Sequence, residues 1–177
     1  MATSTFSGPV VSKSGFYTTG PATVITKNTS TALTVADHAG KIVYNSAAGA
    51  VTYTLPAINA TADSNVAGPG ADYNNANNIG AKFTIWSDTT KTGSLVVQVA
   101  NTTDVMSGRA IFLDDTAANV VGFNTSASSD TITLNGTTTG GVTPNIIECV
   151  ALASGVWAVN VNSSNTGTPA TPFSAAV

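Results

Sequence analysis

The sequence predicts an all-β fold, built as a single β-sandwich or barrel. Short segments in which apolar and polar residues alternate recur along the chain, and Gly, Pro, Asn and Asp separate them. No window of about a dozen residues combines a 3.6-residue apolar period with good helix formers. About ten strand candidates at short spacing are typical of a sandwich or barrel, with jelly-roll-like, tulip-like or Greek-key connections as the alternatives.

The clearest element is a β-hairpin near the end of the chain, over residues 146–161. Ile147 and Cys149 alternate with residues that point the opposite way, as successive residues of a strand do. Residues 153–155 (Ala-Ser-Gly) turn the chain, and Trp157 opens a second strand whose apolar residues recur at every second position. We expect this tryptophan to anchor the inner face of the hairpin.

Weaker segments of the same kind come before this hairpin. Each contains alternating or β-branched apolar residues and ends at a turn signal. The predicted strands cover two pieces of 24–35, then 41–44, 51–55, 82–86, 95–99, 110–113, 120–123 and 131–134. Turns are expected at 36–40 and 101–108, and Pro56 ends its strand or places it at a sheet edge.

The chain divides into an extended N-terminal arm (1–20), a sandwich or barrel domain (21–162) and a C-terminal tail (163–177). Gly-Pro breaks punctuate the arm, and its apolar side chains favour contact with a surface of its own domain, a neighbouring copy or another protein. A partly disordered terminus is the alternative. The apolar arm residues, which are the predicted partner-binding residues, are Phe6, Val10, Val11, Phe16 and Tyr17.

Residues 57–80 lose the apolar alternation and are rich in Asn, Ala, Gly and Asp. A loop of this length in a compact domain is usually functional or disordered. We expect it to be an excursion on the outside of the fold.

Charged residues make up only 8% of the 177 residues, against about 25% in typical soluble domains. A surface of Thr, Ser, Asn, Gly and Ala is poorly defended against association, so we expect the chain to assemble with copies of itself. The net charge of −3 and the scattered cations argue against nucleic-acid binding. We expect neither a membrane span nor a signal peptide, and therefore cytoplasmic synthesis.

Residue types that carry chemistry are sparse. The only histidine, His38, lies in a predicted turn and is expected to be exposed, while the only cysteine, Cys149, is expected to be a buried apolar thiol. There is no G-x-S-x-G elbow, and one His with one Cys does not make a structural zinc site. Five aspartates lie in predicted turns that could cluster to bind calcium, but each is also a common turn former: Asp88, Asp104, Asp114, Asp115 and Asp130. We predict no catalytic residue, metal or cofactor.

Four short motifs resemble those of small structural proteins of tailed bacteriophages, cyanophage-type virions especially. They are a Thr/Ala-Asp-x-Ala/Ser-Gly turn, a Thr-Leu-Pro strand end, an Asp-x-Met-x-Gly turn and a late Gly-x-Trp hairpin. In this chain they lie at 36–40, 54–56, 104–108 and 155–157. The resemblance covers most of residues 6–173 and includes FSGPVVSKSGF at the front and TPATPFSA at the back.

The resemblance implies a virion surface component, a capsid decoration (cement) protein made in the host cytoplasm. Such a protein binds the major capsid protein at local three-fold positions, as a trimer, and stabilises the shell because it binds the assembled state. One alternative is a receptor- or glycan-binding module of a tail or fibre, in which Tyr73 and the asparagines of 57–80 contact sugars. The other is a non-viral β domain with an unrelated binding role.

Overall fold

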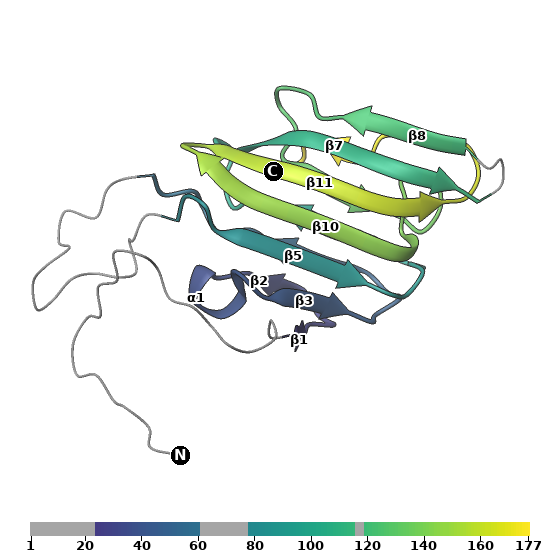
Figure 1. Ribbon diagram of the computed structural model, residues 1–177, viewed down its shortest axis with the longest axis horizontal. Helices are drawn as coiled ribbons and strands as arrows, with labels where there is room; N and C mark the ends of the chain where they lie inside the picture. The colour runs from purple at the N-terminus through teal and green to yellow at the C-terminus, as the bar shows by residue number, and fades with distance from the viewer. Residues whose placement is uncertain (1–23, 61–77, 116–118) are drawn as a thin grey trace, which may run out of the picture.

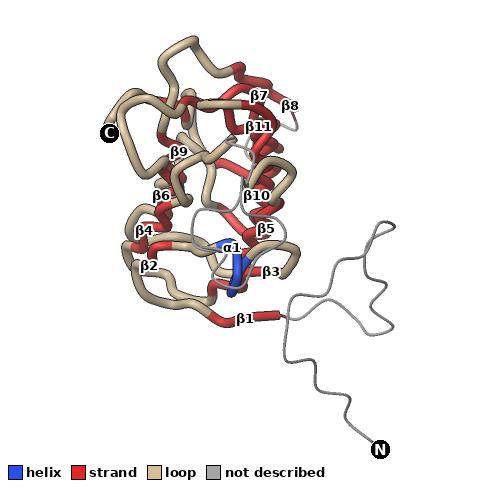
Figure 2. The backbone as a smooth tube through the Cα atoms, turned by 90° about the vertical axis from the view of Figure 1, so that its left-hand side faces the viewer, coloured by secondary structure: helices blue, strands red, loops and turns tan. Residues whose placement is uncertain are grey.

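The computed structural model describes residues 24–60, 78–115 and 119–177. In these residues the chain forms two β-sheets that pack face to face, with the apolar core between them (Figures 1 and 2). The predicted all-β sandwich is confirmed, and neither sheet closes into a barrel. The arm residues Phe6, Val10, Val11, Phe16 and Tyr17 lie outside the described residues, as does most of the predicted loop, including Tyr73.

The larger sheet has seven strands in the order β1-β3-β5-β10-β11-β7-β8. It contains β1 (Val24–Thr26), β3 (Ile42–Asn45), β5 (Lys82–Ser87), β10 (Val142–Ala153), β11 (Val156–Asn165), β7 (Val105–Asp114) and β8 (Asn119–Asn124). The smaller sheet has five strands in the order β12-β9-β6-β4-β2. It contains β12 (Phe173–Ser174), β9 (Thr131–Leu134), β6 (Leu95–Gln98), β4 (Val51–Thr54) and β2 (Thr31–Ala32).

The first six strands alternate between the two sheets, and we call them the coil half. The chain passes from β1 to β2, from β3 to β4 and from β5 to β6, each time crossing from the large sheet to the small one. Each new strand lies parallel to the strand of the preceding coil: β3 on β1, β5 on β3, β4 on β2 and β6 on β4. Three coils therefore stack on one another, which differs from the all-antiparallel strands of a jelly roll.

The remaining strands, β7 to β12, form the hairpin half. The hairpin β10–β11 lies in the middle of the large sheet, with β10 antiparallel to β5 of the coil half and β11 parallel to β7. The outer strand of this half is β8, which precedes the hairpin in the chain and lies antiparallel to β7. The predicted hairpin is present, with its turn at 154–155, and it joins the two halves of the large sheet.

The core is filled by the inward residues of both sheets, as the alternation predicts. Ile147, Cys149, Ala151, Trp157, Val159 and Val161 of the hairpin are all buried. Trp157 packs edge-on against Phe83 of β5, with ring centroids 5.8 Å apart. Burial raises the pKa of the Cys149 thiol to about 12, so this cysteine is inert, as expected from its sequence pattern.

A buried amine closes one end of the coil half. Lys91 is only 3% exposed, and its Nζ donates to Asn45 Oδ1 and to the Ala47 carbonyl oxygen, both at 2.6 Å. Asn45 in turn donates to Tyr53 Oη at 2.7 Å. A Cβ at Gly136, where φ is +81°, would lie 1.8 Å from the Lys91 carbonyl oxygen, so the turn after β9 admits only glycine there. This network ties the turns of successive coils to one another.

The histidine prediction is wrong, because His38 is only 4% exposed. It ends a single helical turn, α1 (Val35–His38), whose N-cap is Thr34. The ring Nδ1 accepts a hydrogen bond from the Thr34 backbone N–H at 3.0 Å, so the imidazole closes the turn from inside. In the described residues no helix is long and apolar enough to cross a membrane.

The predicted turn at 101–108 is shorter than expected, because β7 already begins at Val105. Its first residues pair in parallel with β11, a contact made by distant parts of the chain. Gly108 lies against the backbone of Val159, where a Cβ would come within 1.8 Å of the carbonyl oxygen. The glycine therefore permits close strand packing, which a local reading takes for a turn.

The predicted tail (163–177) belongs to the sandwich in the structure. The strand β11 continues to Asn165, and β12 adds an outer strand to the small sheet beside β9. Phe173 is buried, and the Asp130 carboxylate accepts the backbone N–H of Ala176 at 2.8 Å. The predicted boundary at 162 therefore has no counterpart in the packing.

Candidate docking face on the large sheet

The outer face of the large sheet carries most of the exposed apolar side chains. Among the described residues, eight large hydrophobic side chains are exposed, and five of them point outward from this sheet. These five are Val24, Trp86, Leu113, Val120 and Leu152. The other three, Val35, Ile79 and Val177, lie outside the strands of either sheet. We call this surface the docking face.

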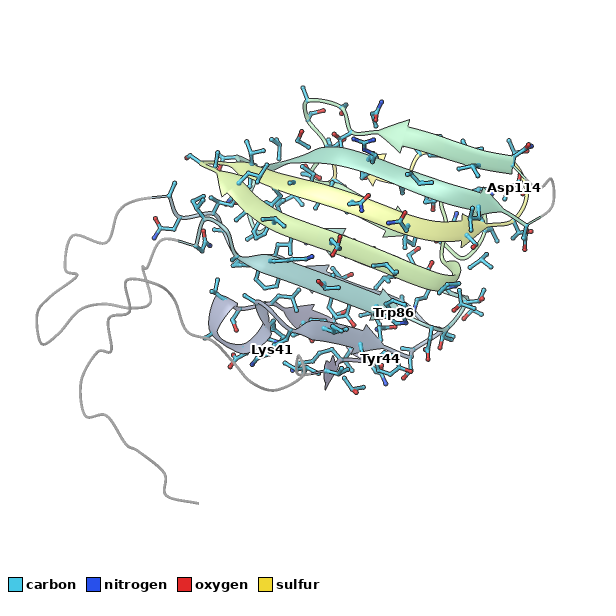
Figure 3. The ribbon with its side chains drawn as sticks, viewed as in Figure 1. Lys41, Tyr44, Trp86 and Asp114 are labelled. Atoms are coloured by element: carbon cyan, nitrogen blue, oxygen red, sulfur yellow. The ribbon has the colours of Figure 1, made fainter. Side chains whose placement is uncertain are left out.

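Two aromatic side chains form one end of the docking face, which we call the aromatic flank. Tyr44 of β3 and Trp86 of β5 are direct neighbours in the register (Figure 3). Trp86 is 38% exposed. Ile146 of β10 is the neighbour of Trp86 on its other side. Since adjacent strands lie about 4.8 Å apart, the three side chains form one continuous apolar surface.

A hydrogen bond fixes the tyrosine of this flank. Tyr44 Oη donates to Asp88 Oδ2 at 2.5 Å. This hydrogen bond raises the pKa of Tyr44 and lowers the pKa of Asp88. The phenol therefore stays protonated and the carboxylate stays charged at neutral pH, beside an exposed indole.

The opposite end of the docking face lies on β7 and β8, and we call it the β8 flank. Leu113 and Val120 are direct neighbours in the register and are 58% and 67% exposed. Beside them is a shallow hollow of about 330 Å³ at Gly122. The hollow is lined by Arg109, Ala110, Ile111, Val120, Gly122, Phe123 and Asn124.

The centre of the docking face is polar. The outward residues of β11 include Asn160, Asn162 and Ser164. Lys82 of β5 and Glu148 of β10 form an ion pair at 2.5 Å. An exposed ion pair contributes about 0–1 kcal/mol, so the polar centre adds hydrogen-bonding groups more than stability.

The outer face of the small sheet has a different composition. Half of its outward residues are threonines, and the others are one glutamine and two small or half-buried apolar residues: Ala32, Thr52, Thr54, Val96, Gln98 and Thr133. None of the exposed large hydrophobic residues of the described chain lies on this face. Only one side of the sandwich is therefore suited to burial against a partner.

The size of the docking face fits a protein partner. Seven strands spaced at about 4.8 Å give it a width of about 29 Å. The strand β7, with ten residues, runs for about 33 Å. A surface with this width and length has an area on the order of the area that each partner buries in a standard interface, about 800 Å².

The structure places the residues singled out from the sequence in different positions. His38 and Cys149 are buried and away from the docking face. Among the described residues no group of three or more His, Cys, Asp or Glu side chains converges to hold a metal ion. The loop at 57–80 is closed at its base, where Asn78 Nδ2 donates to the Ala57 carbonyl oxygen and its Oδ1 accepts from Asn59 N, both at 2.8 Å.

Tyr44 and Trp86 were not predicted as site residues from the sequence. The available signal was the alternation in KIVYN and KFTIWS, which turns both aromatic side chains away from the buried Val43 and Ile85. No family model, curated protein or solved structure matches this chain. A functional proposal is therefore supported by the residues, the resemblance of short motifs and the geometry.

Proposed function

We propose that this chain is a virion structural protein, a decoration protein that binds the outer surface of a viral capsid and stabilises the shell. The observation that carries the proposal is the contrast between the two outer faces: the large sheet presents apolar and aromatic side chains, and the small sheet presents threonines. A decoration protein needs such a contrast, because one side is buried on the shell and the other faces water. The resemblance of four short motifs to phage structural proteins supplies the kind of partner.

In this proposal the partner is the major capsid protein and the docking face lies against it. Trp86 and Tyr44 provide an anchor of the kind that dominates protein interfaces. The polar centre provides amide and hydroxyl groups for hydrogen bonds, and the arm residues Phe6 to Tyr17 extend the contact. Binding as a trimer is part of the proposal and is implied by the resemblance alone.

The first experiment measures the amount of the chain in purified particles relative to the major shell protein. Decoration predicts a ratio of the same order as the shell protein. A ratio of a few per cent would place the chain on the portal, tail or fibres, and absence from particles would overturn the proposal.

The second experiment tests the docking face itself by co-sedimentation with shells that lack the chain. Trp86→Asp, on the docking face, should abolish co-sedimentation, because a carboxylate would be buried at the centre of the aromatic flank. Thr133→Asp, on the opposite face, is the matched control and should bind like the parent chain. Equal binding of both variants would show that another surface contacts the shell. Loss of binding on deletion of residues 2–20 would then identify the arm as that surface.

One observation favours a second candidate, a glycan-binding module. Tyr44 and Trp86 form an exposed aromatic surface with the Asp88 carboxylate beside it, and sugars bind such groups by stacking and hydrogen bonding. Trp157 is fully buried, so the response of the indole fluorescence to a ligand comes from Trp86. A saturable change with oligosaccharides that Trp86→Phe removes would support this candidate. No change across a glycan panel, together with shell binding, would exclude it.

A further inference from the structure

The strand β8 is the one long free edge of the described chain. Each sheet has two outer strands, and β1, β2 and β12 have three, two and two residues, whereas β8 has six. Proteins usually protect long edges with charged side chains, Pro or a bulge. The sequence of β8 (NVVGFN) has no charged residue and no Pro, and its register with β7 is continuous. Its outer backbone groups are therefore suited to pairing with another strand.

A projecting side chain and a hollow lie on the same face of this strand. Val120 is 67% exposed, and two residues further along the hollow of about 330 Å³ opens at Gly122. A Cβ built at Gly122 would meet only the Ala110 carbonyl oxygen, at 3.9 Å. The glycine thus leaves room for a side chain supplied from outside.

From this geometry we propose that two copies of the chain pair through β8, antiparallel, about a two-fold axis at Val121. In an antiparallel pair the numbers of opposed residues have a constant sum, so a two-fold at Val121 places Val120 of each copy opposite Gly122 of the other. Each valine then enters the hollow beside the other copy's glycine. The large sheets of the two copies become one continuous sheet, and Val120 gains an apolar contact on the side that faces away from Leu113.

We infer a second copy as the partner because the projecting Val120 and the hollow at Gly122 both lie on β8. A two-fold contact uses the same patch on both copies, so the projection and its hollow must both be present on that patch. The strand itself carries no charge, and the chain has a net charge of only −3, so repulsion between two copies is weak. This inference does not depend on the proposed function, and the contact differs from the three-fold contact of a trimer.

The test measures the mass of the purified chain in solution by sedimentation or light scattering across a concentration series. The pairing predicts a mass that approaches an even multiple of the chain mass. Val120→Lys should raise the dissociation constant by about tenfold or more, because the added ammonium group would lie beside Arg109, which also lines the hollow. Gly122→Val should do the same by filling the hollow. The matched control is Leu152→Lys on β10, since Leu152 is 56% exposed on the same sheet face and should leave the mass unchanged.

A cysteine at the axis tests the register directly. Opposed Cβ atoms in an antiparallel pair lie about 4.5–5.5 Å apart, so Val121→Cys should form a disulfide between copies under mild oxidation. Leu152→Cys should not, and the buried Cys149 does not compete. A monomer or a trimer at all concentrations, an unchanged mass for Val120→Lys, or equal crosslinking of both cysteine variants would each overturn the pairing.

Discussion

The coil half and the hairpin half build the same two sheets by different routes. In the coil half every pairing within a sheet is parallel and joins strands of successive coils, with a crossing to the other sheet between them. In the hairpin half β7 pairs with β8, and β10 with β11, directly across short connections. The coil half closes its turns with a buried amine at Lys91, whereas the hairpin half is organised around the buried indole of Trp157. We infer that both halves depend on the shared apolar core, and that the coil half adds a buried polar network between its turns.

The largest effect on stability is expected at Trp157, because the packing of the hairpin half depends most on this one side chain. Trp157→Ala should lower the free energy of unfolding by about 3–5 kcal/mol, because the side chain is fully buried and leaves a cavity against Phe83. Trp86→Ala, at the exposed tryptophan, should cost about 1 kcal/mol or less. Urea unfolding of both variants measures the difference. Similar losses would mean that the hairpin half does not depend on its buried indole.

A smaller loss is expected at Lys91, which tests the polar closure of the coil half. Lys91→Met keeps the length of the side chain but leaves Asn45 Oδ1 and the Ala47 carbonyl oxygen without this donor, at a cost of about 1–3 kcal/mol. The matched control is Lys41→Met, because Lys41 Nζ donates to the Asp37 carbonyl oxygen on the surface. Its expected change is within about 0.5 kcal/mol. A neutral or stabilising Lys91→Met would show that apolar burial governs both halves.

Alkaline pH should change the folding stability of the two halves in different ways. The pKa of Cys149 is raised from 9.0 to about 12 by burial, so above pH 9 the unfolded chain loses this proton and the folded chain keeps it. Folding stability that is fully present below pH 9 is therefore lost as the pH rises towards 12, by up to about 1.4 kcal/mol per pH unit.

The coil half contains two buried groups whose pKa shifts change the stability in opposite directions at alkaline pH. Burial raises the pKa of Tyr53, which removes stability as the pH rises above its ordinary value, and burial lowers the pKa of Lys91, which adds stability as the amine loses its proton. The measurement is unfolding between pH 8 and about pH 11 for the parent chain and Cys149→Ala. The difference between the two curves should grow with pH in favour of the variant. Parallel curves would mean that the thiol ionises without unfolding.

The smallest effect is expected where the two halves meet. Lys82 of β5 and Glu148 of β10 form the ion pair across this junction, and they are 50% and 34% exposed. A double-mutant cycle with Lys82→Met and Glu148→Gln should give a coupling energy of about 0.2–1 kcal/mol that falls with added salt. A coupling well above this range would indicate that the junction, and neither half alone, limits stability.

The hairpin half was predictable from sequence because its signals are local. The alternation around Cys149, the turn at 153–155 and the returning Trp157 lie within one short stretch, and they predicted β10 and β11 and their buried faces. The strands of the coil half were also found as segments, but their parallel stacking was not. Two strands that pair across a whole coil share no turn, so no residue between them specifies the register.

Local sequence signals also gave wrong predictions at positions where contacts between distant parts of the chain decide the structure. His38 reads as an exposed turn residue until its ring is seen to close the turn of α1. Gly108 reads as a turn residue until β11 is placed beside it. The docking face was missed for the same reason, because Tyr44 and Trp86 are 42 positions apart in the chain and become neighbours only through the register of β3 and β5. The arm residues Phe6 to Tyr17 stay a prediction, since they lie outside the described residues.

The stacked coils have a consequence for how such a chain can change in evolution. Each coil contributes one strand to each sheet, and successive coils repeat the same parallel pairing, as in Val43 with Ile85 in one sheet and Tyr53 with Val97 in the other. Duplication or loss of one whole coil would therefore widen or narrow both sheets by one strand, about 4.8 Å, and leave the hairpin half intact. Related chains are expected to differ in length by whole coils, so that insertions arrive as complete repeats and the hairpin half keeps a constant size.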